Sequence, residues 1–92
     1  MIKTFKHKGL RKLFEDDDRS GVNPALADKI LDVLDRLDAA FDIQDMQYPG
    51  SKLHQLQGDR KGEWSVNISK NWRVTFTFQD GDAYDVNYED YH

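Results

Sequence analysis

The sequence predicts an α+β fold in the order β-α-α-β-β-β, in which two N-terminal helices pack on an antiparallel sheet. Two observations carry this prediction. Apolar residues recur at helical spacing in the first half of the chain, and the period changes to alternation after Gly62. Consecutive strands with short turns form a meander whose apolar face needs a cover, and the helix pair is the simplest cover. At this length, residues 1–92 are expected to form one domain.

The N-terminal part predicts a short strand over 2–5 and a helix over about 7–15. The apolar face of this helix comprises Leu10, Leu13 and Phe14. The following run "DDDRSGVN" is rich in turn residues and ends the helix.

A second, longer helix is expected to run to about Ala40. Asn23 is the predicted N-cap and Pro24 the first helical residue, because both residue types favour these positions. The outer face of the helix carries Asp28, Asp32, Asp35 and Asp38. This face is either solvated or a docking surface for a basic partner.

Three amphipathic strands are predicted over 64–68, 72–78 and 84–88. Asp80 and Gly81 form the sequence signal of a tight hairpin between the last two strands. The polar face of the sheet carries Arg73, Thr75, Thr77, Asp85 and Asn87. A face with one central arginine is either solvated or a floor for an anionic ligand.

Composition excludes several classes of protein. The chain has no cysteine, so disulfides and thiol chemistry are excluded, and it has no apolar run long enough to cross a bilayer. A cytoplasmic protein without a membrane partner is expected. The net charge of −4 argues against nucleic-acid binding, but a basic block over 46–79 lies between acidic blocks over 15–45 and 80–92.

Cleavage of an RNA backbone needs a base, an acid and a cation that stabilises the phosphate. His54 and His92 suit the proton transfers, Arg73 suits the phosphate, and Tyr91 suits base stacking or acid catalysis. Each residue alone is a weak signal, because a single histidine is more often a surface residue. The acids show no ligand-like spacing, so neither a metal nor another cofactor is expected.

The stretch "KLHQLQGDRKGEWSVNISKNWRVTFTFQDGDAYDVNYEDYH" closely resembles the HigB toxins of the RelE superfamily, and "MIKTFKHKGLRKLFE" matches the same family. The resemblance implies a RelE-like microbial ribonuclease fold and a type II toxin that cleaves mRNA in the ribosomal A site. The reaction it implies is a metal-free attack by the 2′-hydroxyl on the adjacent phosphate. It also implies a HigA-like helix-turn-helix antitoxin, through which alone the toxin would reach operator DNA.

The family's active-site positions fall on His54, Arg73, Asp90, Tyr91 and His92. The resemblance implies that His92 is the main proton-transfer residue and that Arg73 holds the scissile phosphate. Tyr91 would orient or stack the substrate, Asp90 would position its neighbours, and His54 would assist. The terminal histidine is then expected to belong to the enzyme and not to a purification tag.

The predicted RNA-binding residues lie in and around the basic block, and they are Lys52, Gln57, Arg60, Lys61 and Lys70. Some relatives have a lysine at position 57, so the neutral Gln57 is a departure that weakens the expected positive charge of the site.

Three alternatives remain open from the sequence. ParE toxins share the architecture and poison DNA gyrase, but they lack the "KLH", "NWR" and "DYH" residues. A binding module that has lost activity is the second alternative, with Gln57 as its sign. A small domain whose terminal aromatic residues only pack is the third.

Overall fold

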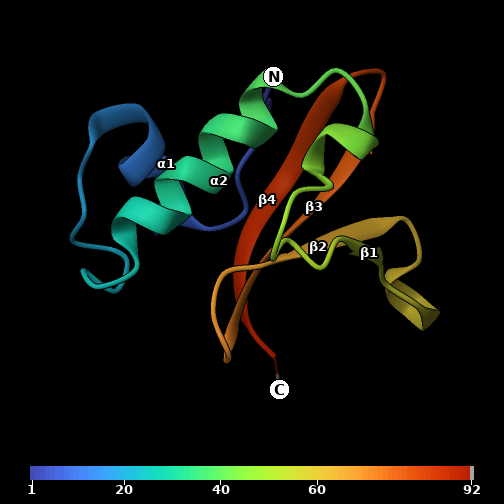
Figure 1. Ribbon diagram of the computed structural model, residues 1–92. Helices are drawn as coiled ribbons and strands as arrows, with labels where there is room; N and C mark the ends of the chain where they lie inside the picture. The colour runs from blue at the N-terminus through green and yellow to red at the C-terminus, as the bar shows by residue number, and fades with distance from the viewer. Residues whose placement is uncertain (92) are drawn as a thin grey trace.

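The computed structural model describes residues 1–91, which form two layers, a helix pair on one face of an antiparallel sheet (Figure 1). The elements in chain order are α1 (Lys8–Asp16), α2 (Ala27–Ala39), η1 (Ile43–Met46), β1 (His54–Gln55), η2 (Gly58–Arg60), β2 (Glu63–Asn67), β3 (Trp72–Gln79) and β4 (Asp82–Asp90). The strands lie in the order β1-β2-β3-β4. The predicted fold class is confirmed.

The predicted first strand lies beside β4 but pairs with it at two separate points. Isolated parallel bridges join Ile2 to Ala83 and Phe5 to Val86. Asp85 lies between Ala83 and Val86, the two β4 residues that form these bridges. It has a φ of 54° at the point where the pairing register between β3 and β4 shifts. Such a bulge interrupts regular pairing, so the N-terminal segment does not form a continuous strand.

β1 is an element that the sequence analysis did not predict. It pairs with β2 through His54 opposite Ser65 and Gln55 opposite Trp64. A strand of two residues is too short to show alternation in the sequence. Its pairing is nevertheless what carries His54 to the edge of the sheet.

α1 matches its predicted position within one residue. His7 is its N-cap, and Nδ1 of His7 accepts a hydrogen bond from the backbone N–H of Leu10 at 3.1 Å. Burial lowers the pKa of His7, which favours the neutral ring that this accepting role requires. At the other end, Asp17 adopts a left-handed conformation with φ 53° and closes the helix.

The predicted start of α2 is wrong by three residues. The side chain of Asn23 does act as a cap, since its Oδ1 accepts from the N–H of Ala25 at 2.9 Å. However, the N–H of Leu26 bonds to the carbonyl of Asn23, and the N–H of Ala27 bonds to that of Pro24. These tighter bonds between residues three apart form a turn, and the α-helix begins only after it.

The core lies between the helix pair and one face of the sheet. The helices contribute Leu10, Leu13, Ile30, Leu34 and Leu37, all at most 1% exposed, and the sheet contributes Val66, Val74, Phe76 and Val86, all fully buried. Neither α1 nor α2 has the length and apolarity that crossing a bilayer requires. Because the helix pair covers the apolar face of the sheet, the polar face lies on the opposite side and is not covered by the helices.

The hairpin between β3 and β4 forms where the sequence predicts it. Asp80 and Gly81 have φ values of 53° and 82°, as a tight two-residue turn requires. The turn makes β3 and β4 long neighbours. The opposite ends of β3 and β4, away from this turn, carry the candidate site residues Arg73 and Asp90.

Candidate functional site

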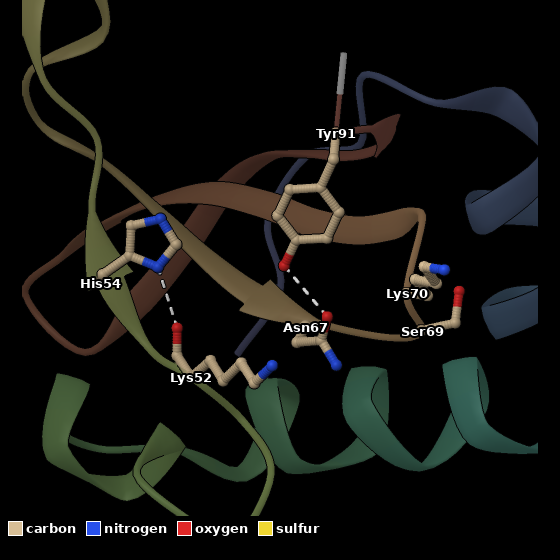
Figure 2. Close-up of a pocket in the computed structure, with 6 residues that line it drawn as sticks. All are labelled: Lys52, His54, Asn67, Ser69, Lys70 and Tyr91. Carbon is tan, nitrogen blue, oxygen red and sulfur yellow. Dashed lines mark hydrogen bonds between the residues drawn. The ribbon is translucent and has the colours of Figure 1, made fainter.

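A cleft of about 530 Å³ opens beside the end of β4. It is lined by Lys52, His54, Asn67, Ser69, Lys70 and Tyr91. These residues come from the segment around β1, from the end of β2 and the turn after it, and from the residue that follows β4 (Figure 2). The cleft therefore joins three parts of the chain that are distant in sequence.

His54 is fixed at the cleft by its own local backbone. Its Nδ1 lies 2.9 Å from the carbonyl oxygen of Lys52 (Figure 2). A carbonyl only accepts hydrogen bonds, so Nδ1 carries the hydrogen in this contact. In the neutral ring, Nε2 is then the nitrogen that keeps a lone pair and can accept a hydrogen bond. Lys52 itself adopts a positive φ of 48°, which bends the chain into β1.

Tyr91 is held from three directions. Its hydroxyl donates to Oδ1 of Asn67 at 3.0 Å, as Figure 2 shows, and its N–H donates to the carbonyl of Asn71 at 2.9 Å. The guanidinium carbon of Arg73 lies 5.3 Å from the centre of its ring, within the range of a cation–π contact. The residue after β4 is thereby anchored to β2 and β3.

Arg73 lies on the polar face of the sheet, with its guanidinium over the Tyr91 ring, and does not line the cleft. The side chain is 16% exposed, and its Nη2 lies 3.3 Å from Oε1 of Glu89. Within residues 1–91, its Nε has no hydrogen-bond partner. Among the described residues, the predicted phosphate-binding arginine thus has one buried, unpaired Nε–H and one long contact with a carboxylate.

Glu89 is the centre of a polar network on this face. Its carboxylate accepts hydrogen bonds from Thr75 Oγ1 at 2.6 Å, from Asn87 Nδ2 at 3.4 Å and from both terminal nitrogens of Arg60. The hydrogen bonds from Arg60 are the main cause that lowers the pKa of Glu89, to about 2. Glu89 is therefore ionised throughout the neutral range.

The polar face is consequently not an open floor for an anion. Thr75 is fully buried, and Glu89 and Arg60 occupy the surface beside it. Thr75 pairs with Asn87 as alternation predicts, whereas Asp85 lies at the bulge and is exposed. The polar face is not open because the ion pair between Arg60 and Glu89 occupies the position that an anionic ligand would take.

The predicted site residues separate into groups in the structure. The cleft brings together Lys52, His54, Lys70 and Tyr91. Asp90 lies at the end of β4, opposite Trp72 in register, and is exposed. His92 lies outside the described residues.

The remaining predicted residues lie away from the cleft lining. Gln57 and Lys61 are exposed, and the amide nitrogen of Gln57 lies 3.5 Å from the carbonyl of Gln55. Arg60 directs its donors at Glu63 and Glu89. RNA binding by these three side chains stays a prediction.

The sequence analysis missed three residues that build this region, Asn67, Ser69 and Glu89. Asn67 pairs with Arg73 in register, so strand alternation could have placed it on the same face. Glu89 lies two residues after Asn87 and shares its face for the same reason. In the sequence alone, nothing distinguished Glu89 from the other acidic residues near the C-terminus.

The sequence of the chain is similar to known toxins along its length. It is 52% identical over 92 residues to "Endoribonuclease HigB" from Proteus vulgaris, with both chains covered in full. It is 34% identical over 85 residues to "Toxin HigB-1" from Vibrio cholerae serotype O1, with 90% of each chain covered.

Solved structures share the fold at low sequence identity. YafQ from Escherichia coli strain BL21(DE3) superposes with a TM-score of 0.59 at 12% identity, covering 99% of this chain and 92% of YafQ. A chain of the YoeB–YefM complex from Staphylococcus aureus gives 0.59 at 18% identity, covering 97% and 95%. Residues 3–92 match the family described as the RelE-like toxin of the type II toxin–antitoxin system HigB. Given this match and the full-length identity to a HigB protein, the chain belongs to the HigB-like family of RelE-like toxins.

Proposed function

We propose that this protein is the toxin of a type II toxin–antitoxin pair and a ribosome-dependent endoribonuclease that cleaves mRNA in the ribosomal A site. One observation carries the proposal: in a member of the HigB-like family, His54 and Tyr91 share a cleft with Lys52 and Lys70. The cleft is open to solvent and bordered by cations, which suits an extended polyanion. The name of the relative from Proteus vulgaris, an endoribonuclease, supports the same activity.

The proposed reaction is a metal-free attack of a 2′-hydroxyl on the adjacent phosphate, which forms a 2′,3′-cyclic phosphate and breaks the bond between phosphorus and the 5′-oxygen of the next nucleotide. A base takes the proton of the 2′-hydroxyl, and an acid protonates the 5′-oxygen that leaves. His54 and His92 supply the base and acid, because histidine changes protonation state near neutral pH. Arg73, whose guanidinium lies beside the Tyr91 ring at the wall of the cleft, supplies the positive charge that neutralises the phosphate, and cationic stabilisation of the transition state is often the largest catalytic term. Tyr91 presents its ring to the substrate, and Asp90 positions its neighbours.

Lys52 and Lys70 are the cations best placed to bind the RNA backbone, since both line the cleft. Lys61 and Gln57 are exposed on the adjoining segment and extend the proposed RNA-binding surface. Contacts with phosphate position the strand without reading its sequence.

An antitoxin is the proposed regulatory partner. The family is defined by type II toxin–antitoxin systems, and the structural neighbour YoeB is seen in complex with YefM. A HigA-like helix-turn-helix protein is the antitoxin proposed here, with operator DNA reached only through it. The toxin is expected to act in the cytoplasm, where ribosomes translate mRNA.

The experiment that tests this function maps RNA 5′ ends after adding the protein to a translation extract. One arm contains ribosomes translating a defined mRNA, and a second contains the same mRNA without ribosomes. Cuts within codons of translated mRNA only are expected. Cleavage of free mRNA at the same rate would contradict ribosome dependence, and absence of cleavage in every arm would contradict the nuclease.

A further inference from the structure

Arg60 is bound on two edges by carboxylates. Its Nε and Nη2 donate to Glu63 at 3.0 Å and 2.9 Å, while Nη1 donates to Glu89 Oε1 at 2.7 Å and Nη2 also donates to Glu89 Oε2. Four of the five N–H donors of a guanidinium are therefore directed at acids of the same chain. Little of this cation is left to contact RNA.

Glu89 is shared unequally between two arginines. Its Oε1 lies 2.7 Å from Arg60 Nη1 but 3.3 Å from Arg73 Nη2. The geometry with Arg60 is bidentate, the stronger arrangement of an arginine–carboxylate pair, and that with Arg73 is a single long contact. Arg60 thus holds most of the negative charge of Glu89, while Arg73 makes, among residues 1–91, only the long contact with this carboxylate.

We propose that Arg60 is a positioning residue: by neutralising Glu89, it leaves the charge of Arg73 available for the scissile phosphate. The inference rests on the proposed function, because it assigns Arg73 the phosphate. Arg60 acts through Glu89 and touches neither the substrate nor the reacting atoms. Hydrogen bonding from Arg60 is the largest cause that lowers the pKa of Glu89, which agrees with Arg60 being its stronger partner and Arg73 its weaker one.

The consequence of losing Arg60 follows from the charges of the network. Arg60 and Arg73 balance Glu63 and Glu89 in the folded protein. Without Arg60, two carboxylates remain beside one arginine, and Glu89 is free to form a bidentate pair with Arg73. An uncompensated carboxylate in a partly buried site is costly and also repels an approaching phosphate.

The test compares the wild type with Arg60→Gln, Arg60→Lys and the double variant Arg60→Gln/Glu89→Gln in single-turnover cleavage of ribosome-bound mRNA. The double variant keeps the net charge of the network, and the glutamine at position 89 keeps an oxygen that accepts from Thr75 and Arg73. Arg19→Gln is the matched control, because Arg19 is also bound by two carboxylates, Asp17 and Asp28, but does not line the cleft.

Arg60→Gln is expected to lower the maximal rate by about tenfold or more, with little change in the toxin concentration at half-saturation. The double variant is expected to recover to within about threefold of wild type, Arg60→Lys to retain most activity, and Arg19→Gln to match wild type. Rescue by removing a second charge separates neutralisation from a loss of RNA contacts.

A double variant that stays about tenfold or more below wild type would overturn the proposal. A half-saturating concentration raised in both Arg60→Gln and the double variant would also overturn it, because this result indicates direct RNA contact by Arg60. Thermal unfolding reports which variants are folded, and if Arg60→Gln alone fails to fold, the double variant against wild type decides the question. A wild type without cleavage would refute the proposed function itself, whereas an active wild type without rescue would refute only this inference.

Discussion

The hydroxyl of Tyr91 donates a hydrogen bond to the side-chain oxygen of Asn67 at 3.0 Å, across 24 positions of sequence. This bond fixes the aromatic ring at the wall of the cleft, beside Arg73. It also uses the hydroxyl hydrogen, so we expect Tyr91 to act through its ring.

Tyr91→Phe should therefore retain much of the activity. The ring and its contact with Arg73 stay, and the lost hydrogen bond is worth about 1 kcal/mol of stability. We expect single-turnover cleavage to fall by about tenfold at most, and Tyr91→Ala to fall further because the stacking surface is lost. Asn67→Ala serves as the control that breaks the same bond from the other side. A loss of about a thousandfold in Tyr91→Phe would instead identify the hydroxyl as a catalytic acid.

Removal of His92, or its replacement by glutamine, should abolish growth inhibition and RNA cleavage while the protein stays folded. Loss of a general acid or base costs about 10²–10⁴ in rate. Circular dichroism reports the fold and single-turnover kinetics report the rate, with His54→Gln measured in parallel. Near wild-type cleavage by the truncated protein would show that proton transfer does not depend on this residue.

Gln57→Lys should raise the cleavage rate by up to about tenfold, because a cation on the segment that adjoins the cleft stabilises the more highly charged transition state by at most about 1–2 kcal/mol through solvent. Gln57 is exposed, and its one side-chain hydrogen bond within residues 1–91 is the long contact to the carbonyl of Gln55, so the lysine is accommodated. Gln57→Ala is the control and should change little. The measurement is cleavage of ribosome-bound mRNA at saturating toxin, and a slower lysine variant would indicate a specific role for the glutamine.

The acidic face of α2 should bind the antitoxin through basic residues. Within this face, Asp28 pairs with Arg19 and Asp38 accepts from the N–H of Ile2, whereas Asp32 and Asp35 are exposed. Reversing Asp32 and Asp35 to lysine should slow association and weaken its dependence on salt, because charge complementarity acts mainly on the on-rate. Stopped-flow binding to the antitoxin measures both. Unchanged kinetics would place the docking surface elsewhere.

The Glu89 network should make stability depend on acid pH. The pKa of Glu89 falls from its ordinary value of 4.5 to about 2 in the folded protein, chiefly through hydrogen bonds from Arg60. Because the folded value is the lower one, the stabilisation is present above 4.5 and is lost as the pH falls through about 2. At about 1.4 kcal/mol per pH unit, the contribution at neutral pH is at most about 3 kcal/mol.

Urea unfolding of wild type and Glu89→Gln across this pH range measures the effect. The wild-type advantage in the free energy of unfolding should shrink as the solution is acidified. The difference between the two proteins isolates Glu89 from the other carboxylates, including Glu63, whose pKa is also lowered by Arg60. If the difference in the free energy of unfolding between the two proteins stays the same at every pH, the ion pair between Arg60 and Glu89 contributes nothing to folding.

The sequence by itself determined the two layers. Apolar residues recur at helical spacing around Leu10 and Ile30, and they alternate with polar residues around Val74. Each pattern allows one arrangement in which the apolar side chains are buried, and Leu10, Ile30 and Val74 are all buried in the structure. The turn at Asp80 and Gly81 was likewise determined locally, because few residue pairs adopt positive φ in succession without strain.

Only the tertiary structure decided what the polar side chains do. Arg60 and Glu89 are 29 positions apart, and Arg73 and Glu89 are 16 apart, so no local pattern indicates that one carboxylate serves both arginines. The pairing of β1 with β2, which carries His54 to the cleft, rests on two residues and has no period to detect. Apolar burial constrains every residue of a strand or helix face and so leaves a repeating signal, whereas an ion pair depends on the distance between single side chains brought together by the complete fold.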